Sequence, residues 1–199
     1  MNAHARVHAV TAALEGRLLT AADAAASGDP GGETKYGVSQ RLLDSLGVTR
    51  ESIVAPRRVD EVTPQVAERI GRALFWETTH CGELWMASPS LALVVYDCAF
   101  QSGPDRAVKL LQVALGVTAD GSVGPVTLAA AQSCAEPLLV ALDAIAERRA
   151  FLMRWAPGEE RRAALVRGLH HRCDEISRAA VAIESECRGW DMRAPLAYA

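Results

Sequence analysis

The sequence predicts an all-α protein with one small β-hairpin, and three observations support this. Half of the 199 residues are hydrophobic but only 5% are aromatic, which is typical of helical globular proteins rich in Ala and Leu. Apolar residues recur at helical spacing, as Val7, Val10 and Leu14 do in the first helix. Residues 28–37, with Pro30 and several glycines, interrupt this pattern and predict a turn or short hairpin.

Start and stop signals place the expected helices in order. The first covers residues 4–15, and residues 21–26 fit either a helix or a loop. Ser39 is expected to cap a helix that Gly47 ends, residues 48–62 to form a loop, and Thr63-Pro64 to start a helix reaching about residue 80. Ser88-Pro89 precedes an apolar central helix over 91–101. Further helices are expected at 104–115, from 125, at 137–155 and at 159–186.

Charge and composition narrow the functional classes. The net charge of −3 gives no reason to expect nucleic acid as a partner. No apolar run reaches the roughly 18 residues of a membrane span, and the N-terminus lacks the apolar core of a secretory signal, so we expect a cytoplasmic product. The five cysteines lack metal-site spacing, so we expect free, mostly buried thiols, no metal and no cofactor. A disulfide formed in an oxidising compartment is the alternative.

Glu15 is the candidate for acid chemistry. It ends the first predicted helix, at the edge of the apolar stripe and before a polar loop. The negative end of the helix dipole and partial burial both raise the pKa of a carboxyl group. Glu15 would then hold a proton that it can give to a leaving oxygen. The alternative is a solvated side chain before a helix end.

Two blocks around this glutamate resemble a known family. Glu15-Gly16 and the stretch 29–39, DPGGETKYGVS, are similar to the paired signature E-G-G … D-x-G-G-x-T-x-x-G-I-[ST]. This signature belongs to glycoside hydrolase family 108, the N-acetylmuramidases of phage endolysins and of bacterial muramidase secretion factors. Arg17 departs from the pattern, because the family carries a second glycine there.

Later blocks extend the resemblance. Phe75-Trp76 stands where the family has Tyr-Trp, and residues 96–103 resemble F-D-x-x-x-N-x-G, with Gln101 in place of Asn. Residues 111–127 are similar to the L-Q-x-x-L-x-V … D-G-x-x-G-P-x-T block of an accompanying peptidoglycan-binding module, and residues 167–172 are similar to a terminal G-W-x-x-R.

The resemblance implies a lysozyme-like, two-lobed helical fold. Residues 1–103 would form the catalytic lobe, residues 104–187 a peptidoglycan-binding-like lobe packed on it, and residues 188–199 a tail. The implied reaction is hydrolysis of the β-1,4 bond between N-acetylmuramic acid and N-acetylglucosamine. Rival readings are a lytic transglycosylase, an inactive wall-binding module and a helical interaction protein.

The implied site residues each carry an alternative. Glu15 would be the general acid, aided by Asp29 or by Thr34 placing water, although Asp29 also suits a turn and Thr34 a structural strand position. Substrate contacts would come from Lys35, Tyr36, Gln101 and Trp76, the last of which could instead be a core aromatic. Asp97, inside the most apolar helix, is expected to be a buried and paired structural anchor.

The implied partner is the glycan strand of peptidoglycan, bound by a monomer. The stretch Arg148–Arg178 holds eight arginines against four acids. It either contacts anionic lipid or lipopolysaccharide, or forms a solvated helix pair. Without a signal sequence, we expect the protein to reach the wall by holin-type or dedicated release.

Overall fold

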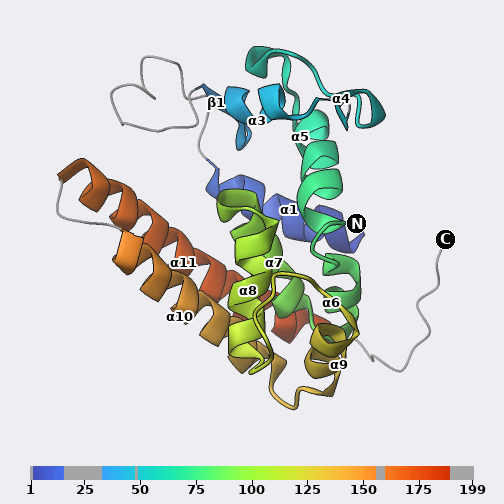
Figure 1. Cartoon of the computed structure of the whole chain (residues 1–199), viewed down its shortest axis with the longest axis vertical. Helices are drawn as coiled ribbons and strands as arrows, with labels where there is room; N and C mark the ends of the chain where they lie inside the picture. The colour runs from blue at the N-terminus through green and yellow to red at the C-terminus, as the bar shows by residue number, and fades with distance from the viewer. Residues whose placement is uncertain (1, 16–32, 48, 156–159, 189–199) are drawn as a thin grey trace.

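The computed structural model describes residues 2–15, 33–47, 49–155 and 160–188 (Figure 1). The elements of the first half are α1 (Ala3–Leu14), β1 (Thr34–Lys35), β2 (Val38–Ser39), α3 (Gln40–Ser45), α4 (Thr49–Ser52), the 3-10 helix η1 (Val59–Glu61), α5 (Pro64–Gly71), the π-helix η2 (Arg72–Trp76), α6 (Cys81–Ala87) and α7 (Pro89–Ser102). The second half contains α8 (Pro104–Ala114), α9 (Pro125–Ser133), α10 (Pro137–Trp155) and α11 (Glu160–Arg188). The predicted all-α class with one small hairpin is confirmed.

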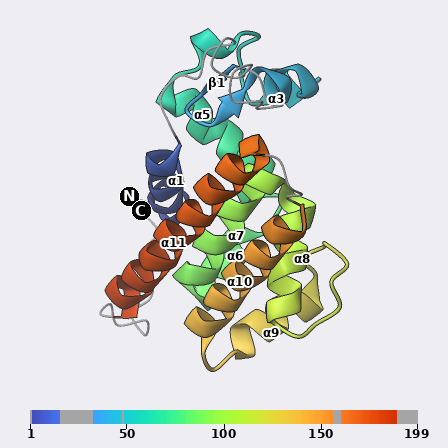
Figure 2. The same ribbon diagram turned by 90° about the vertical axis from the view of Figure 1, so that its left-hand side faces the viewer.

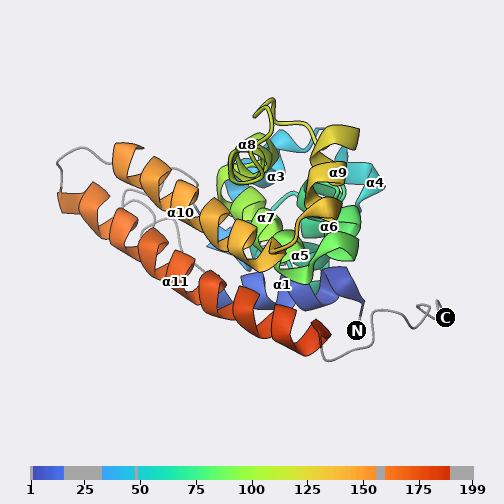
Figure 3. The ribbon, with the colours of Figure 1, turned by 90° about the horizontal axis from the view of Figure 1, so that it is seen from below.

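Helix α7 is the centre of the larger lobe. Every residue from Pro89 to Ala99 is buried, as expected for a helix that is apolar all round. Helices α6, α8, α10 and α11 pack around it. Helices α10 and α11 lie side by side and cover one flank of α7 (Figures 2 and 3). One core therefore includes residues from α1 to α11, on both sides of the expected boundary at 103–104.

The start of α7 depends on a residue from the far end of the chain. The carboxylate of Glu184, in α11, accepts hydrogen bonds from Ser88 Oγ at 2.6 Å and from Ser90 N at 3.2 Å. A carboxylate at a helix N-terminus satisfies free backbone N–H groups and complements the helix dipole. This contact also fixes α11 on the central helix.

A smaller lobe, at the top of Figure 1, contains the hairpin, α3, α4, η1 and α5. It has its own apolar cluster, made of Val38, Leu43, Leu46, Val59, Val62, Ala67 and Ile70. Ser39 Oγ accepts from Leu42 N at 3.1 Å, and Thr63 Oγ1 accepts from Val66 N at 3.3 Å, so both predicted N-caps are present. These two apolar clusters define the larger and the smaller lobe of the structure, a division that differs from 1–103 and 104–187.

Two predicted segments differ from the structure. The helix expected over 64–80 changes at Arg72 into a π-helical turn, in which Glu77 N bonds to Arg72 O at 3.0 Å, and a left-handed His80 separates α6 from it. The extra residue of a π-turn shifts the helical register, so that Phe75 and Trp76 are both buried. The loop expected over 48–62 contains α4 and η1.

The cysteines are free thiols, and all but Cys134 are buried. In the parts of the chain that the structure describes, no helix has both the length and the apolarity to cross a membrane. The same parts hold no cluster of three His, Cys, Asp or Glu side chains suited to a metal ion.

Candidate active site

Glu15 stands where α1 ends. Its backbone N–H donates to Ala12 O at 3.1 Å and closes the helix, while Asn2 Oδ1 accepts from Ala5 N at 2.8 Å and caps the start. The buried residues of α1, His4, Val7, His8 and Thr11, lie at helical spacing and dock it on the large lobe. The packing of one helix face thus fixes the position of Glu15.

The hairpin turn brings the small lobe against this glutamate. Gly37 has φ of +75°, and a Cβ added there would lie 2.9 Å from Glu15 Cγ and closer still to the ring of Phe100. Only glycine combines this backbone conformation with so close an approach. Glu15 therefore lies at the junction of the two lobes.

Arg172 of α11 bridges Glu15 to a second carboxylate. Its Nη1 lies 2.6 Å from Glu15 Oε1. Its Nε and Nη2 donate to Asp97 Oδ1 at 3.0 and 2.6 Å. One buried guanidinium is thus shared between the helix-end glutamate and the central helix.

Arg148 of α10 completes what we call the carboxylate–arginine cluster: Glu15, Asp97, Arg148 and Arg172. Arg148 Nη1 lies 2.7 Å from Asp97 Oδ2, and its Nη2 donates to Gln101 Oε1. Asp97 is fully buried and held by two arginines. The prediction that Asp97 is a buried, paired anchor is confirmed, as expected for a carboxylate removed from water.

Burial raises the pKa of Glu15. Arg172 opposes this shift by charge and hydrogen bonding, and the negative charge of Asp97 adds to it. The side chain is only 17% exposed, so loss of solvation outweighs the arginine. The raised pKa agrees with the sequence prediction, although burial is its main cause, and it suits a group that must hold a proton.

The predicted hairpin residues lie in β1 and in the turn that follows it. Thr34 is half-buried in β1 and pairs with Ser39 of β2. Lys35 Nζ donates to Asp60 O at 2.6 Å, which ties the hairpin to η1. Tyr36 is 40% exposed at the turn, with φ of +52°. Asp29 and Arg17 lie outside the described residues.

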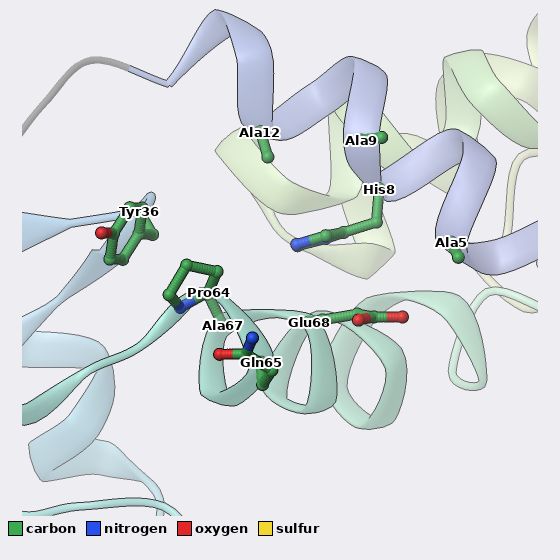
Figure 4. A pocket seen from close by; sticks show the side chains of 9 residues that line it. All are labelled: Ala5, His8, Ala9, Ala12, Tyr36, Pro64, Gln65, Ala67 and Glu68. Carbon is green, nitrogen blue, oxygen red and sulfur yellow. The ribbon is translucent and has the colours of Figure 1, made fainter.

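A cleft of about 320 Å³ opens beside Tyr36, between α1 and α5 (Figure 4). One wall is a face of α1 that includes His8 and Ala12, and the other is the start of α5, with Pro64 and Glu68. Ala12, three positions before Glu15, lines this cleft, whereas Glu15 itself is not one of its lining residues.

Trp76 and Gln101, both predicted to contact the substrate, instead contact other side chains of the protein. Trp76 is 8% exposed, and its ring meets His4 and Tyr96 edge-on at centroid distances of 5.3 and 6.0 Å. It is a core aromatic, so the expected sugar-stacking face is not available. Gln101 is exposed, but its side-chain oxygen accepts from Arg148 and so supports the carboxylate–arginine cluster.

Sequence reasoning missed Arg148 and Arg172 as site residues. The sequence held one signal that could have found them. Asp97 lies inside an apolar helix, and a buried carboxylate requires counter-charges, which the arginine-rich stretch Arg148–Arg178 could supply. These two arginines are 2% and 7% exposed, so they do not belong to a solvated face. Arg149 pairs with Asp174 at 2.6 Å, and Arg178 pairs with Glu175.

A two-lobed helical fold with a partly buried glutamate at the lobe junction defines a lysozyme-like protein. Residues 9–103 match the family model described as Glycosyl hydrolase 108, and residues 106–174 match that of a Predicted Peptidoglycan domain. The first half of the chain is thus similar to the glycosyl hydrolase 108 family, and most of the second half to a peptidoglycan domain. Together the two matches support a peptidoglycan hydrolase, a glycoside hydrolase whose partner is peptidoglycan.

A solved structure has the same overall fold. The chain is similar to the protein in "Structure of Brucella abortus SagA", with 26% identity and a TM-score of 0.73. The match covers 91% of this chain and 95% of that one, so it includes both lobes. The search of curated proteins found no match.

Proposed function

We propose that this protein hydrolyses the β-1,4 bond between N-acetylmuramic acid and N-acetylglucosamine, with Glu15 as the general acid. The observation that carries this proposal is a carboxyl group of raised pKa at the junction of the two lobes. The family match supports glycoside hydrolysis, and the peptidoglycan domain supports the polymer.

In the proposed reaction, Glu15 gives its proton to the glycosidic oxygen while the bond from that oxygen to the anomeric carbon breaks. The bonding electrons go to the leaving oxygen, and positive charge develops on the sugar ring. Water then attacks the anomeric carbon and loses a proton, aided by Asp29 or positioned by Thr34. Glu15 is left ionised, and Arg172 at 2.6 Å stabilises that anion.

The remaining parts of the proposal concern contacts and location. Tyr36 and Lys35 would contact the glycan at the edge of the junction. We propose that the protein is made in the cytoplasm as a monomer and acts on the wall after release. Contact with anionic lipid or lipopolysaccharide would involve Arg154 and Arg167, which are exposed.

Clearing of purified sacculi tests the activity. We expect wild-type protein to clear them and Glu15→Gln to lose at least about 100-fold in rate, because general acid catalysis contributes roughly 10²–10⁴-fold. Glu51→Gln is the matched control, since Glu51 is exposed on α4 in the small lobe. Clearing by Glu15→Gln at the wild-type rate would refute the role of Glu15. A wild-type protein that pellets with sacculi without clearing them would be a binding module.

A further inference from the structure

The cleft between α1 and α5 (Figure 4) carries polar groups that the proposed reaction does not use. We propose that this cleft is a second sugar-binding site, which takes an N-acetylhexosamine residue beside the lobe junction. The choice of sugar rests on the proposed function, because that function makes an amino-sugar strand the substrate. Glu15 does not line the cleft, so this site is separate from the candidate acid.

The shape of the cleft suits a small ligand. Helix α1 lines it with residues 5, 8, 9 and 12, which share one helix face. Three of these four residues are alanines, so short side chains on α1 leave room for a ligand. The volume of about 320 Å³ lies within the range of small-molecule sites, roughly 300–1,000 Å³.

The α1 wall offers a hydrogen-bond donor. Tyr96 is fully buried, and its hydroxyl lies 2.8 Å from His8 Nδ1, its one hydrogen-bond partner in the described part of the chain. A buried hydroxyl proton needs an acceptor, so Tyr96 donates to Nδ1 and His8 carries its own proton on Nε2. Burial lowers the pKa of His8, which agrees with a neutral ring.

The Nε2–H group of His8 is open to the cleft. Nε2 makes no hydrogen bond to the described residues, and it is not a buried atom. Figure 4 shows the ring of His8 pointing from α1 towards α5. The donor therefore faces the opposite wall.

The α5 wall offers acceptors. Glu68 lines the cleft with its side chain 42% exposed, and its ion-pair contact among the described residues is His4 Nδ1, 3.7 Å away. Because the pKa of His4 is lowered to about 4, His4 is neutral at neutral pH and leaves this carboxylate uncompensated. Gln65, which is exposed, adds an amide that can both donate and accept.

Tyr36 adds an aromatic face to the lining of the cleft. Its side chain is 40% exposed, and its backbone lies in the left-handed region, with φ of +52°. This conformation is uncommon for residues other than glycine. Pro64 lies beside it on the α5 wall (Figure 4). The apolar C–H face of a sugar ring can pack on such a surface.

Together these groups select a sugar over other classes of ligand. No Lys or Arg of the described chain lines the cleft, and Glu68 is negative, so an anionic ligand would be repelled. An ammonium group would face the N–H of His8, and a purely apolar ligand would leave Glu68 unpaired. A sugar hydroxyl can donate to Glu68, an acetamido oxygen can accept from His8, and the acetamido methyl group can pack on the alanines.

Titration of ¹⁵N-labelled protein, followed by NMR, tests the site without any reaction. The titration uses Glu15→Gln protein, so that the probe stays intact, and adds either N-acetylglucosamine or its β-1,4-linked tetramer. We expect shifts of the amide signals of residues 5–12 and 64–68 and of the His8 Nε2–H signal. Shifts with both probes would support a site for released sugar, and shifts with the tetramer alone would support a site for the strand.

Ala9→Phe should fill the cleft from α1 without disturbing the core, because Ala9 is exposed. We expect it to raise the Kd of the tetramer, measured from the α1 and α5 signals, at least about 10-fold. Ala129→Phe is the matched control, since Ala129 is an exposed residue of α9 outside the cleft, and it should bind like the parent protein.

Circular dichroism checks that these variants fold. If Ala9→Phe does not fold, Glu68→Ala takes its place, with Glu51→Ala as its control in the same lobe. Glu68→Ala should also raise the Kd at least about 10-fold, because it removes a charged acceptor.

Shifts confined to the hairpin and α7, no shift with either probe, or an unchanged Kd in a folded cleft variant would overturn the inference. The proposed function is judged separately, by clearing of sacculi with wild-type protein. Binding in the cleft without clearing would refute the hydrolase and keep the sugar site, whereas clearing without binding in the cleft would do the reverse.

Discussion

Glu15 and Asp97 share one guanidinium but have different surroundings. Asp97, in the central helix, forms ion pairs with two arginines, whereas Glu15, at the lobe junction, forms an ion pair with one. The sequence predicted that Glu15 ends the first helix and that Asp97 is buried and paired, because each follows from the residue's own helix. The acid role of Glu15 stays a proposal. The sequence did not predict Arg148 and Arg172, which lie 51 and 75 positions from Asp97 and are two of eight arginines in one stretch.

The buried residue His4 gives a prediction about the pH dependence of stability. Its ring packs against Trp76 and Tyr96 in the core. Burial, with the charges of His8 and Arg72, lowers the pKa of His4 to about 4. When the pKa of a histidine is lower in the folded protein than in the unfolded chain, the unfolded chain binds the proton first as the pH falls. The free energy of unfolding is therefore unaffected above the unfolded-state pKa and decreases as the pH falls from that value towards the folded-state pKa. We expect His4 to account for about 2 kcal/mol of the unfolding free energy lost between pH 7 and pH 4.

Urea unfolding of wild-type protein and His4→Phe at both pH values measures this effect. Phenylalanine keeps an aromatic ring in the core and removes the titration. The variant should therefore lose about 2 kcal/mol less than wild type on acidification. Equal losses in the two proteins would show that His4 is not the titrating group.

At the scale of elements, the sequence predicted the features that depend on neighbouring residues, such as helix caps. It did not predict features that depend on packing in the core. The caps at Ser39 and Thr63 depend on a bond to a residue three positions away, so the sequence alone specifies them. The π-turn at 72–76 was missed because the core selects it, by burying both Phe75 and Trp76. The antiparallel pairing of Thr34 with Ser39 follows from the glycine-containing turn between them.

The hairpin turn gives a prediction about how the lobes meet. Gly37→Ala should destabilise the protein by about 3 kcal/mol and slow clearing, because the new Cβ strains the backbone and collides with Glu15 and Phe100. Gly47→Ala is the matched control: Gly47 also has positive φ, but no atom lies within 4 Å of an added Cβ. The Gly47→Ala variant should lose only about 1 kcal/mol of unfolding free energy and should clear sacculi at the wild-type rate. Urea unfolding and the clearing rate measure both variants. If the two substitutions have equal effects, the close approach of Gly37 to Glu15 and Phe100 is not important for stability or activity.

At the scale of the whole molecule, the two family regions share one core. Helix α7 belongs to the matched glycosyl hydrolase region, whereas α8, α10 and α11, which cover it, follow residue 103. Asp97 obtains both of its arginines from that second region. The sequence suggested a boundary at 103–104 from its motifs, and motifs carry no information about which helices cover one another.

This sharing predicts that residues 1–103 do not form a stable catalytic unit alone. The fragment would expose the buried face of α7 and leave Asp97 without a partner, at a cost of several kcal/mol. We expect it to show no cooperative thermal transition by circular dichroism, whereas the full chain unfolds in one transition seen equally by fluorescence. A fragment that melts cooperatively and clears sacculi would show that the second region is dispensable for the fold.

The most direct test of the central claim, that Glu15 protonates a glycosidic bond at the lobe junction, is mass analysis of sacculus digests made with wild-type protein and with Glu15→Gln. Wild-type digests should contain fragments with a reducing N-acetylmuramic acid end, and Glu15→Gln digests should lack them. Reducing N-acetylglucosamine ends, anhydro-muramyl ends, or the same fragments from the Glu15→Gln digest would contradict the account.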